Sequence, residues 1–99
     1  MLNFVEDWLA AHGAELKAAT VIYRVKRTHS DSVSSILVEM VSAAAEAQVI
    51  AWEDGRMDAL VGRVSGGIAF SAHADFGADY QTSAAHFLAI VLDQMTANS

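Results

Sequence analysis

An Asp-Gly pair between two apolar runs is the feature that most restricts how this chain can fold. Asp54-Gly55 follows residues 47–53 and precedes residues 56–64, and each of these flanking runs has the length of a strand. Asp-Gly is a preferred sequence for the tight type I′ hairpin turn, because both central residues of that turn adopt positive φ. We therefore expect two antiparallel strands joined at Asp54-Gly55.

Three further segments alternate with a period of two, which is typical of half-buried strands. They span residues 20–27, 33–42 and 68–76, and polar turns are expected at 29–32 and 65–67. In the second segment the alternation places Ile36, Val38 and Met40 on one face and Leu37, Glu39 and Val41 on the other. In the third it points Ile68, Phe70, Ala72, Ala74 and Phe76 inward and Ala69, Ser71, His73 and Asp75 outward. The alanine-rich residues 43–48 fit either a helical turn or the start of a strand.

Helical patterns lie at the two ends of the chain. Residues 4–12 predict a helix with Asn3 as N-cap, Glu6 completing a capping box, and Gly13 as the residue that ends it. Residues 83–96 predict a second helix, whose apolar stripe is Phe87, Leu88, Val91, Leu92 and Met95. This order predicts one α+β domain over residues 1–99: an antiparallel meander sheet of four to five strands flanked by an N-terminal and a C-terminal helix.

The composition is acidic and lacks cysteine. The formal net charge is −6, which opposes binding to nucleic acid and to anionic membrane surfaces and favours a basic protein partner. The absence of cysteine excludes disulfides and thiolate metal sites and suits a cytoplasmic location. No signal peptide or apolar run long enough to cross a membrane is visible in this sequence.

No catalytic motif stands out, and we expect no catalytic residue, no metal and no cofactor. His73 and Asp75 share one face of a predicted strand, where they could bind a metal or act as a base and its orienting group, but a solvated surface pair is the more common arrangement. Glu53, Asp54 and Asp58 cluster at the hairpin, where a solvent-exposed turn is favoured over a catalytic carboxylate pair. The sequence therefore favours a binding protein over an enzyme.

Residues 49–60 resemble a known family. The segment combines an apolar strand, Trp-Glu-x-Gly-x-x-Asp and a second strand, and it is similar to the TriTu group of bacterial immunity proteins. Those proteins are small acidic partners of antibacterial ADP-ribosyltransferase toxins delivered by secretion systems. The resemblance implies an antitoxin that binds the cognate toxin domain at its basic or NAD-binding cleft and occludes the active site. A monomeric chain is compatible with such a complex.

The resemblance carries over no contact residues, so the expected toxin contacts come from this sequence alone. They are the acidic residues Glu39, Glu53, Asp54, Asp58 and Asp75, with Trp52 as an aromatic anchor. Core packing is the favoured role for Trp8 and also for Trp52, for which the aromatic anchor is the alternative. Two alternatives stay open: a small-ligand or enzymatic domain that uses the His73/Asp75 face, and a homodimeric adaptor module that pairs through a sheet edge or face.

Overall fold

The computed structural model describes residues 1–29 and 32–96, and it has the predicted α+β architecture. Two of the four residues of the turn expected at 29–32 lie outside the described residues. The elements in chain order are α1 (Leu2–Ala11), α2 (Gly13–Ala18), β1 (Ile22–Thr28), β2 (Ser35–Val41), β3 (Ala45–Trp52), β4 (Arg56–Arg63), β5 (Ile68–Asp75) and α3 (Gln81–Thr96). None of the helices in these described ranges is long and apolar enough to cross a membrane.

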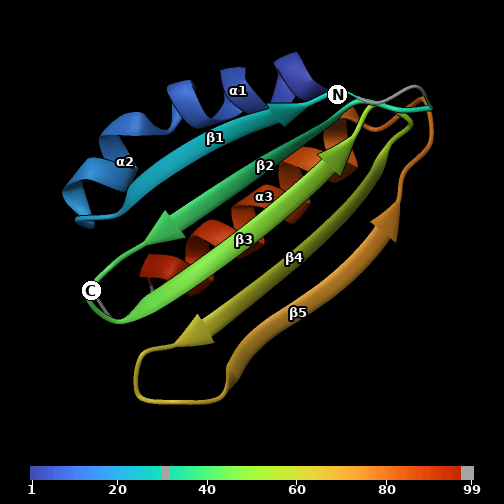
Figure 1. Ribbon diagram of the computed structural model, residues 1–99. Coiled ribbons are helices and arrows are strands. Elements are labelled where there is room, and N and C mark those ends of the chain that lie inside the picture. The colour runs from blue at the N-terminus through green and yellow to red at the C-terminus, as the bar shows by residue number, and fades with distance from the viewer. Residues whose placement is uncertain (30–31, 97–99) are drawn as a thin grey trace.

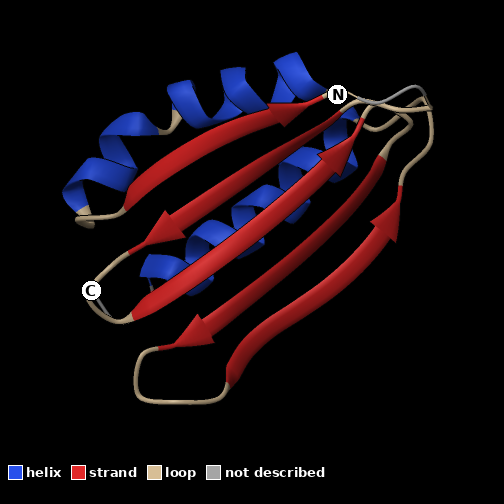
Figure 2. Ribbon diagram, viewed as in Figure 1, coloured by secondary structure: helices blue, strands red, loops and turns tan. Residues whose placement is uncertain are grey.

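The five strands form one antiparallel sheet in the order β1-β2-β3-β4-β5, so every strand pairs with its neighbours in the sequence. The helices lie against one face of this sheet, which we call the covered face, and the other face is the open face (Figures 1 and 2). Figure 1 looks onto the open face, and α3 lies behind the strands in that view. The architecture is therefore two layers, with one sheet face free of any described element.

The core lies between the covered face and the helices. Strands β2, β3 and β4 alternate between buried and more exposed residues, as the period of two predicts. The whole predicted stripe of α3 is buried, and so is Trp8 of α1. On β3 the covered side chains are small, namely Ala45, Ala47, Val49 and Ala51, and this lets helices α1 and α3 pack closely on the strand. The ambiguous residues 43–48 thus enter a strand at Ala45.

The β3–β4 hairpin exists where it was predicted, but its turn type differs from the prediction. The Gly55 amide donates to the Trp52 carbonyl oxygen at 3.0 Å, so Glu53 and Asp54 are the central turn residues. Only Gly55 of this turn has positive φ, at +100°, whereas a type I′ turn needs positive φ at both central positions. The loop is one residue longer than predicted, and the glycine takes the left-handed position that follows the turn.

The N-terminal helix differs from the prediction at both ends. Its N-cap is Met1 and no side chain caps it, so the predicted capping box is wrong. Asn3 and Glu6 instead accept hydrogen bonds from Arg27 of β1, with Arg27 Nη2 2.8 Å from Asn3 Oδ1 and Nε 2.8 Å from Glu6 Oε1. Gly13 does not end the helical region, because it begins the short helix α2.

Two assignments on β5 are also wrong: Ile68 was expected to point inward, and Ala69, which packs against the core, was expected to point outward. Phe70, Ala72 and Ala74 pack against the core as predicted, but Ile68 is 70 % exposed. The register between β4 and β5 shifts at Val61/Gly62, where Ile68 becomes the partner of Gly62. A β-bulge inserts an extra residue in one strand and so breaks the alternation that placed Ile68 inward.

Candidate functional site: the open face of the sheet

The open face is a five-stranded surface that no described element covers (Figure 1). The register places twenty residue positions on it, four from each strand: Ile22, Arg24, Lys26, Thr28, Ser35, Leu37, Glu39, Val41, Glu46, Gln48, Ile50, Trp52, Arg56, Asp58, Leu60, Gly62, Ile68, Ser71, His73 and Asp75. Apolar and charged residues are mixed on it. Val41 and Leu60 are 49 % and 44 % exposed, whereas the apolar side chains of β2 to β4 on the covered face are buried. A surface that combines exposed apolar groups with charges is typical of protein-binding sites.

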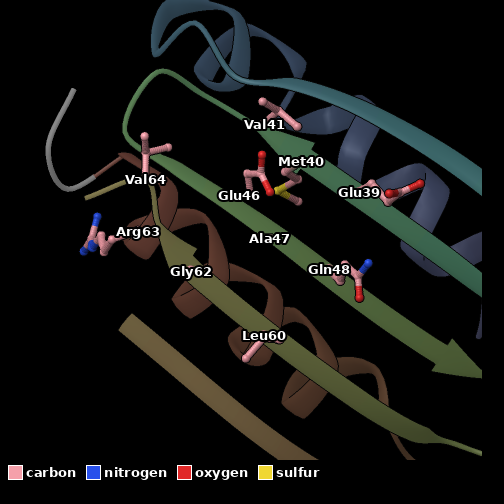
Figure 3. Close-up of a pocket in the computed structure, with 10 residues that line it drawn as sticks. All are labelled: Glu39, Met40, Val41, Glu46, Ala47, Gln48, Leu60, Gly62, Arg63 and Val64. Atoms are coloured by element: carbon pink, nitrogen blue, oxygen red, sulfur yellow. The ribbon is translucent and has the colours of Figure 1, made fainter. Parts of the chain in front are cut away.

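A shallow hollow of about 550 Å³ lies over β2, β3 and β4 at one end of the open face (Figure 3). Its floor is low at Gly62, which has no side chain, and Leu60, Val41 and Val64 stand around it. Glu46 lies in this hollow and is exposed. Among the residues that the structure describes, Glu46 has no ion-pair or hydrogen-bond partner for its carboxylate, so this charge is available to a ligand.

Glu46, Val41 and Leu60 are the residues that the predicted site lacked. The predicted third strand began at residue 47, so Glu46 was left in a connection with no assigned face. A strand from Ala45 would have placed Glu46 on the same face as Gln48, Ile50 and Trp52, because side chains two apart share a face. The available signal was therefore the alternation of residues 45–52.

Three of the six predicted contact residues lie on strands β2, β4 and β5 of the open face. Glu39 Oε1 accepts from Arg24 Nη2 at 3.2 Å, and the Asp58 carboxylate contacts Nδ1 of His73 on the neighbouring strand. Asp75 Oδ1 accepts from the Gly77 amide at 3.1 Å. Each of these carboxylates is exposed to some degree but already has a partner in the chain, so a binding partner has to compete for it.

The other three predicted residues lie at the β3–β4 hairpin. The prediction of core packing for Trp52 is wrong, because the register places this residue on the open face, where its ring is half-buried. The Arg56 guanidinium lies over the Trp52 ring, with Cζ 4.8 Å from the centroid. Arg56 Nε is also 2.9 Å from Asp54 Oδ2, and this hydrogen bond lowers the pKa of the Asp54 carboxyl. Trp52, Arg56 and Asp54 thus form one stacked, ion-paired group beside the open face.

The turn residue Glu53 points elsewhere. Its Oε1 lies 3.2 Å from the amino nitrogen of Met1, so it contacts the start of α1. Taken together, the fold brings Glu39, Trp52, Asp58 and Asp75 to one face and leaves Glu53 and Asp54 at its border. The four residues on the face are spread over strands β2 to β5 and do not form a single cluster.

The His73/Asp75 pair was the candidate for catalysis or metal binding. His73 contacts Asp58 across the strands, and a second shallow hollow of about 390 Å³ runs beside this pair over β3 to β5. Within the described part of the chain, no three His, Cys, Asp or Glu side chains gather in a geometry that could hold a metal ion. What the arrangement can do chemically is present a hydrogen-bonding imidazole–carboxylate pair at a solvent-exposed surface, where His73 is 68 % exposed.

Comparison with protein-family models and with curated protein sequences finds no match to this chain. The open face and its residues are therefore the basis for the functional proposal.

Proposed function

We propose that this chain is a non-catalytic protein inhibitor of the immunity type, which binds a toxin domain through the open face. The observation that carries the proposal is the uncovered five-stranded face, on which exposed Val41 and Leu60 stand beside carboxylates. In most sheets the apolar side chains of a strand pack against a covering layer. A sheet face that carries apolar side chains but has no such layer is therefore typical of a surface that binds another protein.

The chemistry of the face favours a basic partner surface. From β2 to β5 the open face carries Glu39, Glu46, Asp58 and Asp75 and, within the described residues, one Lys or Arg, Arg56, while Arg24 and Lys26 lie at its β1 edge. The whole chain has a net charge of −6, which would steer it toward a positively charged cleft and raise the association rate. The resemblance at residues 49–60 supports an ADP-ribosyltransferase toxin as this partner, and we propose that the inhibitor occludes its NAD-binding cleft in the cytoplasm.

Glu46 is the side chain we expect to matter most in binding. It is exposed, it has no partner among the residues described, and the hollow around it also presents Val41, Leu60 and Val64 to a binding partner. The paired carboxylates Glu39 and Asp58 would contribute less, because their present partners must be displaced. Reversing the charge at Glu46 should weaken the complex by roughly tenfold or more.

The test is co-expression and pull-down with the protein encoded beside this chain, followed by an ADP-ribosylation assay with and without the purified chain. We expect a stoichiometric complex and loss of transferase activity. Glu46→Lys and Leu60→Asp should each restore activity. Glu15→Lys, the same charge reversal on helix α2 at the opposite side of the molecule, is the matched control and should still inhibit.

Two outcomes would contradict the proposal in different ways. A complex that forms but is indifferent to Glu46→Lys and Leu60→Asp would exclude the open face as the interface. A neighbouring protein that does not bind, or that binds without any transferase activity to block, would exclude the toxin as the partner.

A further inference from the structure

The two edges of the sheet differ in a way that bears on self-association. β1 and β5 each pair with one strand in the described part of the chain, so each presents a row of backbone N–H and C=O groups along its outer side. Such an edge can accept a further strand, and natural proteins block unwanted pairing with charged side chains, above all Lys.

β1 is protected in this way. Its seven residues are all exposed and include Arg24, Lys26 and Arg27. If two copies paired through β1 as antiparallel strands centred on Val25, Arg24 of each copy would lie opposite Lys26 of the other. Like charges directly opposite each other destabilise a strand pair, so β1 is unsuited to pairing with itself.

β5 has no such protection. It contains no Lys or Arg, and the inner side chains Phe70, Ala72 and Ala74 are only half-buried, because α3 packs mainly over the strands before it. A groove of about 710 Å³ runs between β5 and α3 and is lined by Phe70, Phe76, Phe87 and Ile90. The rings of Phe70 and Phe76 meet Phe87 edge-on at 6.5 and 6.0 Å between centroids. An apolar groove thus adjoins an unprotected strand edge.

We propose that a second copy of this chain binds along β5, and that the two copies form one continuous antiparallel sheet. In a two-fold pairing centred on Ala72, Phe70 lies opposite Ala74 of the second copy and Ser71 lies opposite its His73. Large side chains therefore meet small ones on the groove side, and no like charges are opposed on the outer side. The pairing forms about eight backbone hydrogen bonds and joins the two grooves.

The acidic residue of β5 does not oppose this arrangement. Asp75 is three residues from the two-fold axis, so the two copies of Asp75 are offset by six residues, or roughly 20 Å along the strands. That distance exceeds the Debye length of about 8 Å at physiological ionic strength, so their repulsion is screened. The proposal goes beyond the toxin-binding function and does not depend on it, since the dimer leaves the open face of both copies free.

The test uses the purified chain alone, with its mass measured by light scattering and sedimentation over a wide range of concentrations. We expect a monomer–dimer equilibrium for the unmodified chain. Ala72→Lys places two ammonium groups beside the two-fold axis and should raise the dimer dissociation constant by roughly tenfold or more. Ala72→Glu should do the same with two carboxylates. An equimolar mixture of the two variants should again form dimers, because opposite charges then meet at the axis.

The mixture also controls for folding, since misfolded variants could not restore the dimer. Thr28→Lys adds the same charge at the opposite edge and should leave the dissociation constant unchanged. The proposal is overturned if the unmodified chain is a monomer at every concentration. It is equally overturned if the Ala72 variants dimerise as well as the unmodified chain, because the interface then lies elsewhere.

Discussion

Gly55 lies where the start of β4 meets the segment that follows β5, and it allows the two backbones to approach closely. Its φ is +100°, and a Cβ built on it would lie 2.2 Å from the carbonyl oxygen of Gly77. The Gly55 carbonyl also accepts from the Phe76 amide at 3.0 Å, so the two backbone segments are fixed in close contact. Only glycine fits this position, both for its conformation and for its space.

Gly55→Ala should therefore reduce the free energy of unfolding by about 2–4 kcal/mol, since it adds a backbone clash to the strain of positive φ. Gly66→Ala is the matched control: its φ is +109°, but nothing lies within 4 Å of the added Cβ. That variant should lose about 1 kcal/mol from strain alone. Urea denaturation measures both values, and equal losses would show that the contact with Gly77 relaxes freely.

Arg27 ties β1 to α1 through an exposed ion pair that responds to acid. Its hydrogen bond to Glu6 lowers the pKa of the Glu6 carboxyl and raises the pKa of the guanidinium. Because the Glu6 pKa is lower in the folded state than in the unfolded chain, the stabilisation is present above the ordinary carboxyl range and disappears as the pH falls through the folded-state value.

Arg27→Gln should raise the Glu6 pKa back toward its ordinary value, as followed by an NMR titration of the carboxyl carbon. It should also flatten the acid side of the stability–pH curve. Arg24→Gln, which removes the partner of Glu39 on the open face, should leave the Glu6 titration unchanged. A Glu6 pKa that stays low in Arg27→Gln would mean that another group sets it.

Within a single element, β4 shows the difference in burial between side chains on the covered face and side chains on the open face. Met57 is fully buried on the covered face, whereas Leu60, three residues along the same strand, is 44 % exposed on the open face. Met57→Ala should cost about 2–5 kcal/mol of unfolding free energy, because it leaves a cavity in the core. Leu60→Ala should cost less than about 1 kcal/mol in the isolated chain. Thermal or urea unfolding tests this, and similar losses would mean that something covers the open face in solution.

Alternation predicted the strands well, and the faces of β2 and the stripe of α3 were predicted residue by residue. It failed to predict which face of β3 forms the core. The larger apolar side chains of β3, Ile50 and Trp52, lie on the open face, while alanines fill most of the covered one. Close helix packing selects small residues, so side-chain size pointed to the wrong face for Trp52.

The features that the sequence analysis missed depend on contacts between elements, which a single sequence does not show. The bulge at Val61/Gly62 reversed the expected direction of Ile68, and the ion pair with Arg27 took Glu6 out of the expected cap. The bulge depends on the register of two neighbouring strands, and the ion pair joins residues 21 positions apart in the chain. The pairing of Asp58 with His73 also became visible only through the register of β4 and β5.

For the whole molecule, protection from solvent should decrease from the middle of the sheet to its edges. β3 has paired strands on both sides and four fully or nearly buried side chains, whereas every residue of β1 is exposed. Amide hydrogen exchange should therefore be slowest in β3 and faster in β1. Exchange in β5 should slow as the protein concentration rises if the second copy binds there. Uniform protection of β1 and β3 would contradict the assignment of β1 as an open edge.

The neighbour-to-neighbour strand order also governs how the chain can reach this structure. Every strand finds its partner across one connecting segment, so each hairpin closes a short loop before the next is added. Helices α1 and α3 must also join a strand that is distant in the sequence, because both pack on β3 from opposite ends of the chain. The sheet can therefore form by adding strands outward from the β3–β4 hairpin, and the core is complete once both terminal helices have packed on it.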